Sequence, residues 1–215
     1  MVLSCMGILL VSLGLAVPAS AGRCTTTVLP TLNTDISTWT GGDIYNSVFP
    51  GLQTWNGVPF NLENRNSWSI TNYKVFADSS LTIPVNVYGV IKAYTIINSA
   101  WGQYGATVGK IEFFGSGNSY YKVDLVEGIN VRDHYDGGYN NIIDGINALP
   151  AFDNGPATAR LDMQLYTLPS SFASETLEKI VFTSYDLGPP YGTPFIAALT
   201  VENRVSISGA LMLLY

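Results

Sequence analysis

Short apolar runs, separated by clusters of turn residues, recur along the chain from about residue 58 onward. Several runs are rich in Val, Ile, Phe and Tyr, which is typical of β-strands. Glycine, proline and asparagine clusters such as 115–118 and 188–190 punctuate them. The predicted strands are Val58–Leu62, Trp68–Tyr73, Ser80–Val85, Val90–Asn98, Lys110–Phe114, Tyr120–Leu125, Arg160–Tyr166, Leu177–Ser184 and Phe195–Glu202.

The pattern inside these runs predicts how each strand is buried. In 160–166 the apolar Leu161, Met163 and Leu165 alternate with polar residues, which predicts a half-buried strand, and 120–125 alternates in the same way. The continuous apolar run Phe195–Leu199 predicts a strand covered on both faces. The best helical candidate, 170–178, is one or two turns at most. We therefore expect an all-β chain, folded as an antiparallel β-sandwich of the jelly-roll kind, with few or no helices.

The first residues predict a targeting signal. An apolar stretch, Gly7–Val17, is followed by Ala19-Ser20-Ala21, a small-x-small cleavage pattern. We interpret 1–21 as a secretory signal peptide, although no Lys or Arg precedes the apolar stretch. The predicted location is extracellular or periplasmic. Cys24 is then the one cysteine left, so the sequence predicts no disulfide within the chain.

Three further segments follow the predicted signal. Residues 22–56 mix Thr, Pro, Asn and Gly with scattered apolar residues, and we expect them to be loosely structured. Residues 57–204 form the predicted sandwich domain. The apolar segment 205–215 is too short for a transmembrane anchor, so none is expected. It is interpreted as a final edge strand, with an exposed tail or a truncated sorting segment as alternatives, and self-association through it stays open.

Composition narrows the function. The chain has 215 residues, of which 47% are hydrophobic and only 12% charged, with a net charge of −6. The apolar content excludes a disordered chain, and the acidic balance argues against a nucleic-acid partner. With 13 Tyr and 4 Trp the chain holds many aromatic side chains that can lie against the apolar face of a sugar ring.

Catalytic and metal motifs are weak in this sequence. The single histidine, His134, has no recognisable nucleophile in a Gly-x-Ser-x-Gly turn, and the acidic residues show no marked catalytic pair. We therefore predict no enzymatic activity and no required cofactor. Asp133, Asp136, Asn140 and Asn141 offer oxygen ligands of the type Ca²⁺ prefers, so a structural Ca²⁺ and a set of hydrogen-bonded turn residues are both open interpretations.

The middle of the chain resembles a known family in its strand order and punctuation. The chain from about residue 57 to 201 is similar to secreted, galactose-binding-like jelly-roll domains, including carbohydrate-binding modules found beside bacterial glycosidases. The residues that carry the resemblance are Ile83-Pro84, Ile91–Trp101, Gly109–Phe114, Tyr120–Leu125 and Gly128–Asp133. These motifs are short and include no catalytic signature, and the resemblance implies a sandwich with a carbohydrate partner.

Together these observations predict a secreted, non-catalytic protein that binds a neutral glycan. We expect the site in loops at one edge or end of the sandwich, with aromatic side chains stacking on the sugar and Arg132 and Asp133 bonding its hydroxyl groups. Two other functions stay open: a structural or adhesive surface protein, and a glycoside hydrolase with an unidentified acidic pair. The predicted ligand-binding residues are Trp101, Tyr104, Arg132, Asp133, His134 and Tyr139.

Overall fold

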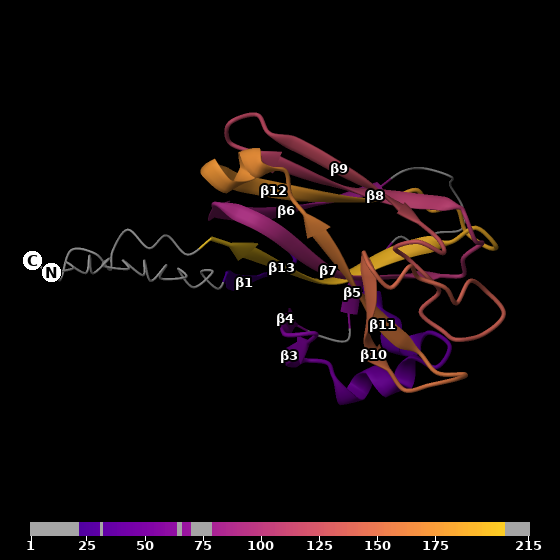
Figure 1. Cartoon of the computed structure of the whole chain (residues 1–215). Helices are drawn as coiled ribbons and strands as arrows, with labels where there is room; N and C mark the ends of the chain where they lie inside the picture. The colour runs from indigo at the N-terminus through magenta and orange to yellow at the C-terminus, as the bar shows by residue number, and fades with distance from the viewer. Residues whose placement is uncertain (1–21, 31, 64–65, 70–78, 205–215) are drawn as a thin grey trace, which may run out of the picture.

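The computed structural model describes residues 22–30, 32–63, 66–69 and 79–204, and most of its strands form two packed antiparallel sheets, with a separate two-stranded hairpin (Figure 1). The predicted all-β sandwich is therefore confirmed. In the part of the chain that the structure describes, no helix is long and apolar enough to cross a membrane. The predicted signal peptide, 1–21, and the apolar segment 205–215 lie outside the described residues.

The larger sheet follows the order β10-β11-β7-β13-β5-β2, and β1 pairs with the part of β13 that β5 leaves open. All pairings in it are antiparallel. Its strands are β10 (Ala148–Asp153), β11 (Arg160–Thr167), β7 (Val90–Ala100), β13 (Thr193–Asn203), β5 (Asn66–Ser69), β2 (Thr34–Asp35) and β1 (Arg23–Thr27).

The smaller sheet follows the order β6-β12-β8-β9 and packs on one face of the larger sheet. Its strands are β6 (Ser79–Tyr88), β12 (Thr176–Ser184), β8 (Thr107–Gly115) and β9 (Tyr120–Val126). Fully buried side chains such as Phe113 and Phe182 from this sheet meet Ile97 and Leu199 from the other. Burying each such side chain stabilises the fold by roughly 1.5–3 kcal/mol.

Most of the predicted strands match observed ones to within a few residues. Val58–Leu62 is β4, and residues 195–199 are buried on both faces as predicted. The expected helical turn at 170–178 is the short 3₁₀ helix η3 (Ser170–Ser174), after which β12 begins. Sequence analysis missed β10, in which a proline interrupts the apolar pattern.

The prediction that β11 is half-buried was wrong. Leu161 and Met163 are buried as expected, but Asp162 and Gln164 on the opposite face are also fully buried. They face a layer of polar side chains beneath the loop that follows β9, and not solvent. Polar residues at alternate positions usually indicate exposure, and here they indicate a buried hydrogen-bonded network.

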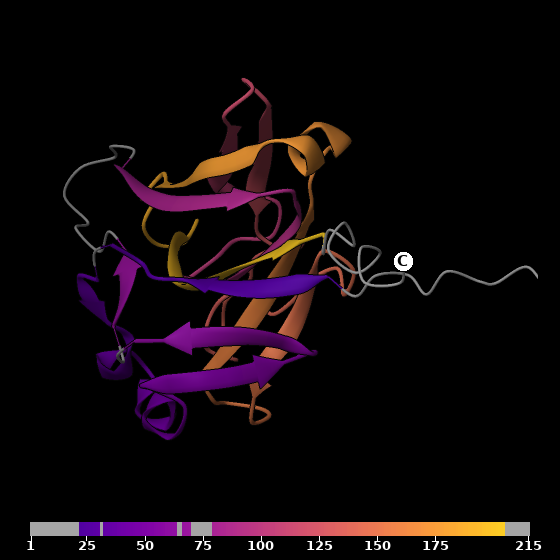
Figure 2. The same ribbon diagram turned by 90° about the vertical axis from the view of Figure 1, so that its left-hand side faces the viewer.

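Residues 22–56 are more structured than the sequence suggested. They contribute β1, β2, two 3₁₀ helices, η1 (Ile36–Thr38) and η2 (Gly42–Ser47), and β3 (Gly51–Trp55), which pairs with β4 (Val58–Leu62). The β3–β4 hairpin lies apart from the two main sheets, beside β1 (Figure 2). Fully buried Ile36, Tyr45 and Phe60 cover the outer face of the larger sheet and form a second apolar core.

The two ends of the sandwich differ. Residues 22 and 204 lie at one end, where β1 pairs with the last residues of β13 (Figure 1). β7 begins there at Val90 and runs to Ala100 at the other end. The loops that follow β7 and β9 gather at this second end, which is where the hollow described next is found.

Candidate functional site

An open pocket of about 500 Å³ lies at the end of β7. This volume is in the range of small-ligand sites, and the lining is predominantly apolar and aromatic, as such sites usually are. The residues that line it are Thr38, Trp39, Thr40, Ala100, Trp101, Asp133, His134, Tyr135, Gly138 and Tyr139.

Three segments far apart in the sequence meet at this pocket. The first segment begins with the last residue of η1, Thr38. Asp35 caps the start of η1 by accepting a hydrogen bond from the Ser37 main-chain N–H at 3.0 Å. The second is the end of β7, and the third is the loop between β9 and β10. Main-chain hydrogen bonds from Ser99 N to Arg132 O (3.0 Å) and from His134 N to Ser99 O (2.8 Å) join the second segment to the third. The pocket wall is thus an extension of the sheet.

Trp101 has a strained main chain at the pocket wall. Its φ is 60°, in the left-handed region that residues with a Cβ rarely adopt. Such a conformation costs roughly 1–3 kcal/mol and persists only where the surroundings impose it. Here Ser99 Oγ donates to the Trp101 carbonyl at 2.7 Å, and the Trp101 N–H donates to the Asp133 carboxylate. The strain positions an aromatic ring beside the hollow.

His134 is held in one orientation by its neighbours. The Tyr45 hydroxyl donates to the main-chain oxygen of Arg160 at 2.9 Å and lies 3.3 Å from His134 Nδ1. Since that hydroxyl proton is already donated, Nδ1–H donates to the tyrosine oxygen and Nε2 remains an acceptor. Trp39 contacts the imidazole edge-on, with 5.2 Å between ring centroids. Burial, with Arg160 nearby, lowers the His134 pKa to about 4, so the ring is neutral at pH 7.

Asp133 is the carboxylic acid of the pocket. It is 3% exposed, and burial raises its pKa to about 6, although main-chain N–H groups and the Arg160 guanidinium favour the ionised form. Tyr135 N donates to its Oδ1 at 2.6 Å. Arg160 Nε bonds the Asp133 main-chain oxygen at 3.0 Å. At neutral pH this carboxylate is therefore charged but poorly solvated.

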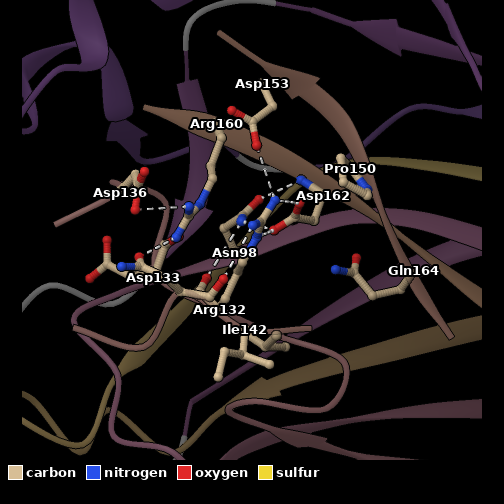
Figure 3. Close-up of polar contacts among 12 residues, drawn as sticks. Asn98, Arg132, Asp133, Asp136, Ile142, Pro150, Asp153, Arg160, Asp162 and Gln164 are labelled. Atoms are coloured by element: carbon tan, nitrogen blue, oxygen red, sulfur yellow. Dashed lines mark hydrogen bonds and ion pairs between the residues drawn. The ribbon is translucent and has the colours of Figure 1, made fainter. Parts of the chain in front are cut away.

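Arg132, which we expected to bind sugar hydroxyl groups, lies in a different environment. Its guanidinium makes a two-pronged ion pair with Asp162, with Nε–Oδ2 at 2.8 Å and Nη2–Oδ1 at 2.7 Å. Asn98 Nδ2 donates to the same carboxylate at 2.6 Å, and Asp153 lies 3.4 Å from Arg132 Nη2. Its donors are used in these contacts (Figure 3), so Arg132 supports the loop, and it is not among the residues that line the pocket.

Arg160 completes what we call the arginine network, the set Asn98, Arg132, Asp136, Asp153, Arg160 and Asp162. Arg160 Nη1 lies 3.5 Å from Asp136 Oδ1, and its Nη2 donates to Asn141 Oδ1 at 2.5 Å. Figure 3 shows the two guanidinium groups close together between β11 and the loop. The network ties the loop that carries Asp133, His134 and Tyr139 to the larger sheet.

A second buried acid, Glu127, lies behind the pocket wall. It is fully buried, and Asn140 Nδ2 donates to its Oε2 at 2.9 Å, while Oε1 has no hydrogen-bond partner among the described residues. A Cβ on Gly102 would lie 2.5 Å from its carboxyl group, and one on Gly192 would lie 2.9 Å from Oε1. Burial raises the Glu127 pKa to about 7. This carboxyl therefore lies where three loops converge, and near pH 7 its protonated and ionised forms are both populated.

The predicted site residues divide into two groups. Trp101, Asp133, His134 and Tyr139 line the pocket together. Tyr104 does not line it: its side chain is 67% exposed and covers Gly128, where an added Cβ would lie 2.3 Å from the ring. Sequence analysis missed Trp39, Tyr135, Thr38 and Thr40. Trp39 belongs to the aromatic set that the composition indicated, but no local pattern placed it beside Trp101. Tyr135 directly follows the predicted His134 in the same loop and was left out of the predicted set.

The residues considered for Ca²⁺ are occupied by other contacts. Asp133 accepts from Tyr135 N, Asn140 Oδ1 accepts from Ile142 N at 3.1 Å, and Asp136 and Asn141 bond Arg160. Within the described ranges, no group of three or more His, Cys, Asp or Glu side chains is arranged to hold a metal ion. These contacts support the turn interpretation.

Comparison of the chain with known protein families, with curated proteins and with solved structures finds no significant match. The case for function therefore depends on the pocket itself.

Proposed function

We propose that this protein is a secreted, non-catalytic carbohydrate-binding protein that holds a neutral glycan in the pocket at the end of β7. The observation that carries the proposal is the convergence of four aromatic side chains, Trp39, Trp101, Tyr135 and Tyr139, on one hollow. Sugar rings present apolar C–H faces, and aromatic rings bury such faces favourably.

Polar groups in the same pocket suit the hydroxyl groups of a sugar. Asp133 is an acceptor, neutral His134 keeps Nε2 as an acceptor, and Thr38 and Thr40 have hydroxyls that both donate and accept. A few such groups in a mostly apolar lining fix the orientation of a ligand. The resemblance to galactose-binding-like jelly-roll modules supports the same partner class.

Binding explains the lining better than hydrolysis does. A glycoside hydrolase places two carboxyl groups on either side of the scissile bond. Among the described residues that line this pocket, Asp133 is the one carboxylic acid. Glu127, the next buried acid, is enclosed behind the wall by Gly102 and Gly192.

The test is a glycan array followed by titration of any hit with the intrinsic tryptophan fluorescence of the protein. We expect binding to a neutral glycan that weakens at least tenfold in Trp101→Ala and in Tyr139→Ala. Tyr88→Ala is the matched control, because Tyr88 is 63% exposed and precedes the start of β7, at the opposite end of the sandwich. A protein that binds no glycan, or an affinity that Tyr88→Ala lowers as much as Trp101→Ala does, would refute the proposal and favour a structural role.

A further inference from the structure

The charge distribution around the pocket indicates which sugars it selects. Among the described residues that line it, none is Lys or Arg, and Asp133 supplies a carboxylate. Aromatic faces carry negative electrostatic potential and attract cations, most strongly where the cation is desolvated. A lining of aromatic rings and one carboxylate is therefore more favourable for a ligand with a positive charge than for a neutral one.

The arginines beneath the pocket do not reverse this preference. Arg132 is paired with Asp162 and Asp153, and Arg160 with Asp136. Three carboxylates therefore oppose these two guanidinium groups before Asp133 is counted. Arg160 donates to the main-chain oxygen of Asp133 at 3.0 Å, and among the described residues no Lys or Arg forms a direct ion pair with the Asp133 carboxylate.

We propose that the pocket binds an amine-bearing sugar, such as a glucosamine unit, more tightly than the matching neutral sugar, with Asp133 bonding the ammonium group. This inference depends on the proposed carbohydrate site and extends its ligands from neutral sugars to sugars that carry a protonated amine. The sugar ring stacks on the aromatic wall while the ammonium group donates to the carboxylate. Hydrogen bonds between charged groups are stronger than those between neutral ones, and the poor solvation of Asp133 increases what a cation gains there.

The groups around Asp133 define the pH range of the effect. His134 is neutral at pH 7 and does not repel a cation. Glu127 lies behind Asp133 and interacts with it as a like charge when ionised, and Arg160 favours the ionised form of Asp133. Tyr45, which the field of Asp133 also reaches, has a pKa well above its usual range and stays neutral. The preference therefore needs a pH above the Asp133 pKa of about 6 and below the pKa of the sugar amine.

The test compares three β-1,4-linked trimers that differ only at carbon 2: glucosamine (amine), N-acetylglucosamine (acetamide) and glucose (hydroxyl). Calorimetric titration of the full-length protein at about pH 6.5 is expected to give the amine trimer at least a tenfold lower Kd than the glucose trimer. Asp133→Asn should lower the affinity for the amine trimer at least tenfold more than the affinity for the glucose trimer, so that the difference between the two disappears. In the unmodified protein the preference should disappear at about pH 5, as Asp133 becomes protonated.

The outcomes distinguish failure of the amino-sugar preference from failure of the carbohydrate site. Equal affinity for the amine and hydroxyl trimers, or a preference that survives at about pH 5 and in Asp133→Asn, overturns the inference and leaves the carbohydrate site standing. Binding of choline as tight as that of the amine trimer shows that the cation alone is recognised, and overturns the amino-sugar assignment. If no trimer binds and no glycan binds on the array, the proposed function fails as well. If Asp133→Asn does not fold, the pH profile of the unmodified protein still decides.

Discussion

Two buried polar regions lie on either side of the same loop, and they differ in how their charges are matched. In the arginine network, carboxylates meet guanidinium groups, and Asp162 takes hydrogen bonds from both Arg132 and Asn98. On the pocket side, Asp133 and Glu127 are buried acids that form no carboxylate–guanidinium ion pair with any described residue, and both have raised pKa values. The arginine network holds the loop against the larger sheet. Asp133 and Glu127, in contrast, are acids whose protonation can change with pH or on ligand binding.

This difference also explains why Arg132 and Asp133, adjacent in sequence, have different roles. Successive residues of an extended segment point to opposite sides. Arg132 thus reaches the larger sheet, while Asp133 and the loop that follows it form the pocket wall. Four predictions test the contrast, beginning with the largest expected effect.

Breaking the network should cost the most stability. Asp162→Ala leaves the Arg132 guanidinium buried without its main partner and also removes the acceptor of Asn98. Loss of one partner of a buried pair typically costs about 3–5 kcal/mol, so we expect the free energy of unfolding, measured with urea, to fall by that amount. Lys122–Asp124 is an exposed pair, and Asp124→Ala, the control, should cost less than about 1 kcal/mol. Equal losses in the two variants would contradict the structural role of the network.

The second prediction concerns Glu127, whose folded-state pKa is raised. Burial favours its neutral form, so its contribution to stability is present below about pH 4.5 and is lost as the pH rises towards about 7. Glu127→Gln is neutral throughout and keeps an acceptor for Asn140. The variant should therefore unfold with a free energy higher than that of the unmodified protein by about 3 kcal/mol at pH 8, and by much less at pH 5.

His134 titrates in both proteins, so its effect cancels in this comparison, whereas the like-charge interaction between Asp133 and Glu127 is part of the difference that is measured. The measurement is urea denaturation of both proteins at the two pH values. A difference in unfolding free energy that does not change with pH would show that Glu127 is not buried in its neutral form.

The third prediction concerns the aromatic wall. Trp101→Ala removes a stacking surface and should weaken glycan binding at least tenfold, which corresponds to about 1.4 kcal/mol. Alanine has a Cβ as tryptophan does, so the main-chain strain at a φ of 60° is the same in the variant. We therefore expect only a small change in the free energy of unfolding. Circular dichroism during thermal unfolding checks the fold, and calorimetric titration checks the affinity. A large loss of stability without loss of affinity would place Trp101 in the core instead.

The smallest effect is expected at Tyr104. Its ring is 67% exposed and covers Gly128 outside the pocket. Tyr104→Ala should therefore change the glycan affinity less than twofold and the free energy of unfolding by less than about 0.5 kcal/mol. An affinity loss comparable to that of Trp101→Ala would show that the glycan also contacts Tyr104, outside the pocket, and would contradict the restriction of binding to the pocket lining.

The strands were predictable from sequence because most of them carry a local signal. Alternation or a continuous apolar run located β9, β11 and β13 directly. The outer layer built by η1, η2 and the β3–β4 hairpin was not visible, since short 3₁₀ segments have no hydrophobic period of their own. Alternation of apolar and polar residues shows which side chains are polar but not whether they are buried. For this reason Asp162 was expected to be exposed, although it is fully buried.

The site was predictable only in part, for a similar reason. Trp101, Asp133, His134 and Tyr139 were found because aromatic and polar residues gather in two loops. Trp39 comes from a segment about ninety residues before the Asp133 loop, and the fold alone brings the two together. Arg132 was assigned to the ligand because its partner, Asp162, lies thirty residues further on, and sequence shows charges without showing their pairing.

The most direct test of the central claim is titration of the protein with a neutral glycan identified on an array, with tryptophan fluorescence as the readout. The unmodified protein, Trp101→Ala and Tyr88→Ala are compared. The account predicts saturable binding that Trp101→Ala weakens at least tenfold and Tyr88→Ala leaves unchanged. Absence of binding to every neutral glycan, or binding that Trp101→Ala does not weaken, would contradict the assignment of the pocket as a carbohydrate site.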